Sequence, residues 1–196
     1  MNAPDFIKLP PHSVEAEQSL IGGLLISGET AWDEIASIVT DVDFYRDDHR
    51  RIFRHIGRLV KTGKSVDVVT VSVSIEQSNE VDQTGGLGYL GEIANATPSA
   101  ANIRHYAEIV ANCASRRRLA VAASRIDALA FGQGDARGAI DEAQRIIAEV
   151  ADTAAASSTE PVAISAILPG QAGRWLLQVR RQGFGRNPAA GVEEHR

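Results

Sequence analysis

Apolar residues recur at the spacing of an α-helix along most of the chain that follows Pro10 and Pro11. Ser13 is a typical N-cap for a first helix, SVEAEQSLIGGLLIS, whose first turn is acidic. The predicted buried face of this helix holds Leu20, Ile21, Leu24 and Leu25. Thr30 then predicts the start of a short second helix, whose apolar residues are Trp32, Ile35, Ile38 and Val39.

A third amphipathic stretch, RDDHRRIFRHIGRLV, runs into GRLVKTGKS, which has the look of a phosphate-binding P-loop. A P-loop has four residues between its first glycine and Gly-Lys-Ser, and it follows a buried strand. Here five residues separate Gly57 from Gly63, and a helix precedes them. We therefore interpret this segment as a helix end, with Lys61 and Lys64 near the negative end of the helix dipole.

A second glycine pattern, GLGYLG, places Gly86, Gly88 and Gly91 at the spacing of a dinucleotide-binding fingerprint. That fingerprint requires an apolar strand before it, whereas the preceding residues are the polar SNEVDQTG. We predict a loop that enters a short helix, YLGEIANA. The β-branched run VDVVTVSVSIEQ is ambiguous, but no second strand is available to pair with it, so we favour a short helix from about Val69.

Residues 98–152 predict a long α-helical hairpin. Ser99 is a plausible cap for a first arm of about thirty residues, GQGD is a turn, and Asp135 caps the second arm. The second arm has apolar residues at the spacing of a packing seam. The predicted interface consists of Ile140, Ala143, Ile147 and Val150, with Ile126 and Leu129 opposite. This seam can close within one chain or pair with another copy, and the sequence leaves both open.

The expected fold is therefore all-α. We predict an N-terminal arm at 1–12 that is disordered, a compact helical globule at 13–97, the hairpin at 98–152, a linker at 153–169 and an irregular tail at 170–196. The tail holds five arginines and two acidic residues, a net charge of +3. Since the whole chain carries −5, residues 1–169 carry −8.

Composition excludes several classes of function. A net charge of −5 argues against a surface that coats nucleic acid, so we expect no direct DNA binding. The single Cys113 excludes an internal disulfide and fits a reducing cytoplasm. The N-terminus lacks an apolar signal-peptide core, and no apolar run is long enough to span a membrane.

Candidate catalytic residues are not evident, and we predict no catalytic, cofactor-binding or metal-binding residue. His49 and His55 are six residues apart and do not share a helix face, which argues against a metal site. Asp47 and Asp48 are interpreted as acids of a helix's first turn. Arg116, Arg117 and Arg118 are interpreted as a solvated face or an inter-subunit salt bridge rather than a DNA contact.

Several segments, in this order, resemble the N-terminal domain of the DnaB-type replicative DNA helicase family. They are LPPHSVEAEQSLIGGLL, DFYRDDHRRIFRHIGRL, VDVVTV, GGLGYLGEIANATPSAANIRHYAEIV and RRRL, within residues 9 to about 169. The resemblance implies an all-α globule and hairpin that pair into a collar on a hexamer and contact primase and helicase loaders. VAISAILP would match the family's linker helix. In the family ATP and Mg²⁺ bind a following ATPase domain, none of whose motifs can be placed on this chain.

The leading hypothesis is thus an oligomerisation and partner-docking domain of a replicative helicase, acting in DNA replication and the primosome without its ATPase motor. It predicts self-association and binding to the C-terminal domain of a primase and to a helicase loader. An alternative is a stand-alone adapter that regulates an intact helicase through mixed oligomers. A third hypothesis is an enzyme that uses one of the glycine-rich segments. The Arg- and Gly-rich tail after Pro169 suggests a frameshift.

Overall fold

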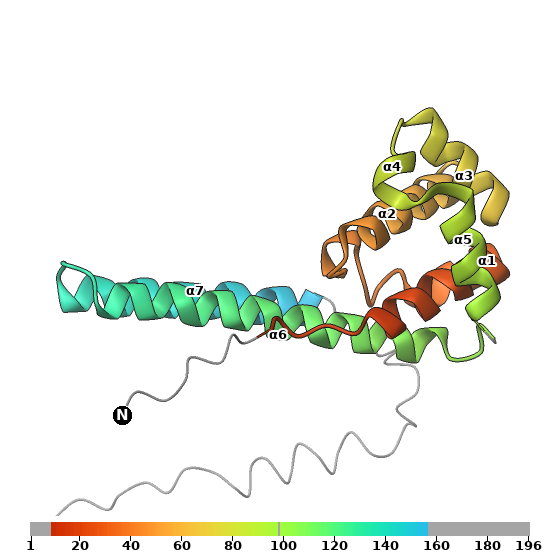
Figure 1. The fold of residues 1–196 in the computed structure, drawn as a ribbon. Helices are drawn as coiled ribbons and strands as arrows, with labels where there is room; N and C mark the ends of the chain where they lie inside the picture. The colour runs from red at the N-terminus through yellow and green to blue at the C-terminus, as the bar shows by residue number, and fades with distance from the viewer. Residues whose placement is uncertain (1–8, 98, 157–196) are drawn as a thin grey trace, which may run out of the picture. The chain divides into compact units, whose positions relative to one another are not determined.

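The computed structural model describes residues 9–97 and 99–156, all within the first of two compact units, Met1–Glu160 and Pro161–Arg196. Figure 1 shows that these residues form helices joined by loops. The helices are α1 Val14–Ile35, the 3₁₀ turn η1 Asp41–Asp43, α2 Asp47–Lys61, α3 Val68–Gln77, α4 Val81–Thr84, α5 Gly86–Ala96, α6 Ile103–Ala130 and α7 Ala136–Ala156. The described residues contain no strand, so the all-α prediction is confirmed. Among them, no helix has the length and apolar character needed to cross a membrane.

The globule, formed by α1–α5 with η1, begins at the cap that the sequence predicted. The amide of Ala16 donates to Oγ of Ser13 at 3.2 Å, which satisfies one free N–H of the first turn. The two helices expected on either side of Thr30 form one helix, α1, which kinks at Gly28, where φ is 59°. Such a positive φ is accessible to glycine at little cost.

The two glycine-rich segments both belong to helices. At the end of α2, Gly63 has a φ of 64°, and the amide of Lys64 donates to the carbonyl of Leu59 at 3.0 Å. This arrangement terminates a helix and confirms the interpretation of the GKS segment. In the second segment the helix starts earlier than expected, because Gly86 and Gly88 belong to α5 rather than to a loop before it.

The β-branched segment forms α3, as favoured above. Asp67 caps this helix, and its carboxylate accepts the amides of Val69 and Thr70, each at 2.8 Å. Val71 and Ile75 then fall on one face, and both are fully buried in the core. A strong cap and two core contacts therefore outweigh the low helix propensity of valine.

The core of the globule lies around α1, which packs against α2, α5 and α6. A Cβ atom on Gly22 would lie 2.9 Å from the carbonyl oxygen of Ile93, so only glycine allows this approach of α1 to α5. The largest buried apolar side chains are Phe44, Leu20, Ile21, Leu24, Ile35, Ile52, Ile56, Ile75, Leu90 and Ile103. The predicted buried face of the first helix is thus part of the core.

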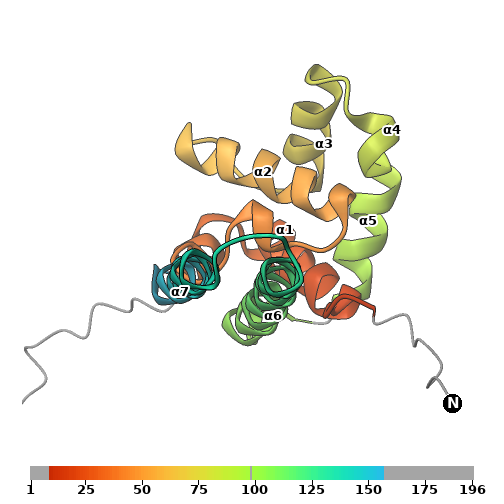
Figure 2. The ribbon, with the colours of Figure 1, turned by 90° about the vertical axis from the view of Figure 1, so that its left-hand side faces the viewer.

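In the hairpin, α6 and α7 run side by side, as Figure 2 shows. Asp135 caps α7 and accepts the amide of Gly138 at 3.1 Å, as predicted. The helix continues to Ala156, so residues 153–156, expected in the linker, are helical; the alanines there favour this. The remaining linker and the tail lie outside the described residues, and the proposed frameshift concerns that region.

The N-terminal arm was expected to end at residue 12 without structure, and its described part differs. The imidazole of His12 stacks on the ring of Tyr45, with centroids 4.4 Å apart. The carbonyl of Pro11 accepts a hydrogen bond from Arg117 at 2.8 Å. These contacts fix the approach to α1, and residues 1–8 lie outside the described part of the chain.

Candidate functional site

The inner seam of the hairpin joins α6 to α7 through small and branched side chains. Ile146 of α7 is 2% exposed, and Ala122 of α6 is also buried. Four of the predicted interface residues, Ile126, Leu129, Ala143 and Val150, are half-buried along the hairpin. The hairpin therefore closes on itself, which was one of the two alternatives.

Two predicted seam residues lie elsewhere. Ile140 and Ile147 of α7 are 59% and 57% exposed, so neither closes the inner seam. The predicted seam used positions 140, 143, 147 and 150, whereas burial follows Ala139, Ala143, Ile146 and Val150. Both sets obey the same seven-residue period, so the spacing alone could not separate them. As an interface with another copy, the set remains a prediction.

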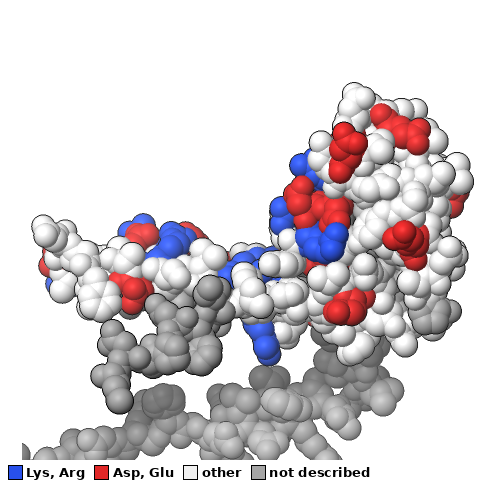
Figure 3. All heavy atoms as spheres, viewed as in Figure 1, with Lys and Arg blue, Asp and Glu red and all other residues white. Residues whose placement is uncertain are grey.

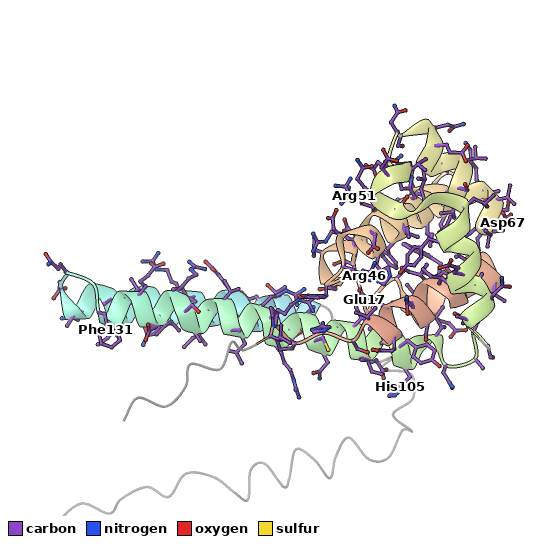
Figure 4. All side chains as sticks on the ribbon, viewed as in Figure 1. Glu17, Arg46, Arg51, Asp67, His105 and Phe131 are labelled. Carbon is purple, nitrogen blue, oxygen red and sulfur yellow. The ribbon has the colours of Figure 1, made fainter. Side chains whose placement is uncertain are left out.

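The outer hairpin residues, defined as Leu119, Val121, Phe131, Ile140 and Ile147, are large, apolar and exposed. Phe131 is 84% exposed at the turn, and Figure 4 shows it at the end of the hairpin away from the globule. Of these residues, Ile140 and Ile147 lie one heptad apart on α7, a spacing typical of residues that face a partner helix. Figure 3 shows charged groups of both signs along the visible hairpin surface, separated by uncharged parts.

The arginines at 117 and 118 tie the hairpin to the globule. Arg118 forms an ion pair with Asp43, whose side chain is buried, and Arg117 donates to the main-chain carbonyl of Asp43. The Arg117 guanidinium also lies over the ring of Tyr45, 5.8 Å from its centroid. Both were expected on a solvated face or between subunits. Their partners lie within this chain, and only Arg116 is exposed.

A buried polar cluster that the sequence analysis missed holds three helices together. Nδ1 of His49 lies 2.8 Å from Oε2 of Glu17, and Nε2 of His49 lies 2.8 Å from the hydroxyl of Tyr89. Glu17 also accepts the amides of Tyr45 at 2.6 Å and Arg46 at 3.3 Å. Figure 4 shows Glu17 and Arg46 where the hairpin meets the globule. The signal was the helical spacing of His49 with Ile52, Phe53 and Ile56, which places it on the buried face.

The second buried histidine, His55, lies between α3 and α4. Its ring nitrogens are 2.9 Å from Oγ of Ser74 and 3.2 Å from Oε2 of Glu80. Burial lowers the pKa of His55 below its ordinary value of 6.5, and this outweighs the opposite effect of Glu80. His55 is therefore held in its neutral form near neutral pH.

Charged groups at the start of α2 are paired. Asp47 and Asp48 lie in the first turn, as predicted, and Asp47 accepts a hydrogen bond from Arg51 at 2.7 Å. This bond holds the pKa of Asp47 below its ordinary value. Figure 3 shows basic and acidic side chains side by side where the globule meets the hairpin.

Metal and phosphate chemistry have little support in the part of the chain that the structure describes. No group of three His, Cys, Asp or Glu side chains there could hold a metal ion. The two glycine-rich segments end or begin helices, and neither forms a phosphate-binding loop.

Comparison with known proteins indicates the family of this chain. The model of the DnaB-like helicase N terminal domain family matches residues 9–112. The chain is 37% identical over 158 residues to the replicative DNA helicase DnaB of Haemophilus influenzae, covering 79% of this chain and 33% of that protein. It is also 37% identical over 144 residues to that of Geobacillus stearothermophilus, covering 73% and 32%. The chain thus spans about a third of the length of these relatives.

Two solved structures have similar folds. The N-terminal domain of DnaB helicase from Mycobacterium tuberculosis aligns with a TM-score of 0.67 at 32% identity, over 72% of this chain and 99% of that one. A structure titled as a DnaB-like replicative helicase and its interactions with primase aligns with a TM-score of 0.61 over 88% of this chain and 36% of that one. Its identity of 20% indicates a shared fold alone.

Proposed function

Because this chain belongs to the family of DnaB-like helicase N-terminal domains, we propose that it is an oligomerisation and partner-docking module of a replicative helicase. In this role it acts in DNA replication by joining subunits and recruiting other replication proteins. It contributes contact surfaces rather than catalytic groups. The ATP and Mg²⁺ of full-length relatives are assigned to no residue of this chain.

The observation that carries the proposal is the exposure of Ile140 and Ile147 on α7. A hairpin that served only to close on itself would gain nothing from two isoleucines one heptad apart on its outer side. Burying each against another copy removes apolar surface from water, worth roughly 1.5–3 kcal/mol for a fully buried isoleucine. We therefore assign self-association to the outer side of the hairpin.

The proposed protein partners are the C-terminal domain of a primase and a helicase loader. Support comes from the family resemblance and from the solved relative whose title names interactions with primase. The primase is the partner to test first, since it is the one described for a DnaB-like replicative helicase of this fold.

Two measurements test the proposal. Analytical ultracentrifugation of the chain should give a mass above that of the 21.0 kDa monomer, rising with concentration. Isothermal titration with a purified primase C-terminal domain should show saturable heat. A monomer at every concentration, together with no heat from the primase domain, would contradict the proposed function.

A further inference from the structure

An open groove lies beside the second half of α2, outside the hairpin. It has a volume of about 570 Å³ and lies between α2 and the end of α1. Arg54, Arg58 and Lys61 line it, and their spacing of four and three residues places them on one face of the helix. All three side chains are exposed. The groove therefore has a basic wall.

The floor of the groove is apolar. The indole of Trp32 stacks on Phe53 with centroids 5.1 Å apart, and Trp32 is only half-buried. A Cβ on Gly57 would lie 2.8 Å from Cη2 of Trp32, so the glycine lets the indole lie against the backbone of α2. Ala36 and Val39 continue this floor. A bulky apolar side chain thus has a surface to pack on.

The charges of the wall are largely uncompensated. Asp41 is the acidic residue in the lining, and it is 3.2 Å from Arg54. Arg58 donates to Oγ of Ser78 at 3.3 Å, and within residues 9–97 and 99–153 neither Arg58 nor Lys61 pairs with a carboxylate. The chain as a whole carries −5, so this positive charge is a local feature.

A second pocket of about 310 Å³ adjoins the first. Arg58 and Thr62 line both, and Lys64 adds another cation to the second. Its apolar surface comes from Val69 and Val73 of α3, which are exposed one helical turn apart. The basic side chains thus stand between two apolar surfaces.

We propose that this surface binds an acidic peptide segment of another protein. Bulky apolar side chains of the peptide enter the two pockets, and its carboxylates pair with Arg58, Lys61 and Lys64. The argument is charge complementarity, joined to a floor that a peptide side chain fills and that a phosphate backbone would leave empty. The lining residues all belong to the globule, so this proposal does not depend on whether the hairpins of two copies pair.

The test uses a fluorescein-labelled synthetic peptide in which Asp and Phe alternate, followed by fluorescence anisotropy with the full chain. Saturable binding is expected, and a peptide with Asn in place of Asp should not bind. The double variant R58E/K61E should bind about tenfold more weakly, because each reversal replaces an attraction by a repulsion. The control R116E/R137E changes net charge equally at exposed sites and should bind as the wild type.

A second variant distinguishes binding in the groove from general attraction between the acidic peptide and a basic surface. Ala36→Arg places a long side chain in the groove and adds a positive charge, so it should weaken binding. The proposal would be overturned if A36R bound the peptide more strongly than the wild type, or if the wild type showed no saturable binding. It would also be overturned if R116E/R137E lost as much peptide affinity as R58E/K61E. Displacement of the peptide by a single-stranded oligonucleotide at lower concentration than by unlabelled peptide would also overturn it. Circular dichroism melts of each variant should match the wild type.

Discussion

Nδ1 of His49 lies 2.8 Å from Oε2 of Glu17, and both side chains are buried, at 0% and 2% exposure. The same carboxylate accepts the main-chain amides of Tyr45 and Arg46. One side chain of α1 therefore satisfies three donors at the start of α2. The geometry makes Glu17 a structural anchor for the globule.

Replacing Glu17 with Ala leaves these buried donors without a partner. We expect a loss of about 3 kcal/mol in the free energy of unfolding, since unsatisfied buried groups cost roughly 1–3 kcal/mol each and water can relieve part of this. Urea unfolding followed by circular dichroism measures it. Glu15→Ala, exposed in the same turn, is the control and should change stability by less than about 0.5 kcal/mol.

Two helical glycines should respond to alanine in opposite directions. A Cβ on Gly22 would lie 2.8 Å from Cβ of Thr97 and 2.9 Å from the carbonyl of Ile93, whereas Gly91 has nothing within 4 Å. Gly91→Ala should raise stability by roughly 0.5–1 kcal/mol, as alanine favours helices. Gly22→Ala should instead lower it by roughly 1–3 kcal/mol through overpacking. If thermal melts showed the same change in midpoint for Gly22→Ala and Gly91→Ala, α1 and α5 would not approach each other as closely at Gly22 as described.

His55 predicts a loss of stability in mild acid. Its folded pKa lies below the ordinary 6.5, so the unfolded chain takes up a proton first as pH falls. The stabilisation is present above about pH 6.5 and is lost as pH falls toward the folded pKa. Urea unfolding at pH 7 and pH 5 should show a smaller pH-dependent loss for His55→Gln than for the wild type. An unchanged pH dependence would mean that His55 is not responsible.

Adjacent isoleucines of α7 should differ in their effect on the fold. Ile146 is 2% exposed and Ile147 is 57% exposed. Ile146→Asp places an unpaired charge in the inner seam and should lower the thermal midpoint of the hairpin, while Ile147→Asp should leave it nearly unchanged at low protein concentration. Circular dichroism melts of the two variants make the comparison. A lower thermal midpoint for Ile147→Asp than for Ile146→Asp would support instead the seam that the spacing alone predicted.

The sequence predicted the elements well because their signals are local. Ser13, Asp135 and Gly63 mark helix ends through hydrogen bonds or backbone angles that involve only neighbouring residues. The same local logic identified the GKS segment as a helix end, whereas the helix at GLGYLG begins earlier than the predicted loop allowed. The choice of a helix for residues 68–77 depended on the absence of a pairing strand, which is also readable from the chain.

Features that depend on distant contacts were harder to predict. Ile147 and Ile146 differ in burial because of how α7 rotates against α6, and a seven-residue period permits both arrangements. Arg117 and Arg118 find partners in Asp43 and Pro11, far along the chain, where charge alone suggested solvent or another subunit. The groove at Trp32 and Arg58 likewise forms only when two helices meet.

The most direct test of the central claim is sedimentation equilibrium of the chain and of its double variant Ile140→Asp with Ile147→Asp. The control is Gln133→Asp with Ser124→Asp, which adds the same charge at two exposed hairpin positions outside α7. We expect an oligomer for the wild type and the control, and a folded monomer of 21.0 kDa for the isoleucine variant. An oligomer of unchanged mass in the isoleucine variant, or a monomeric wild type at all concentrations, would contradict the assignment of the outer hairpin as the self-association surface.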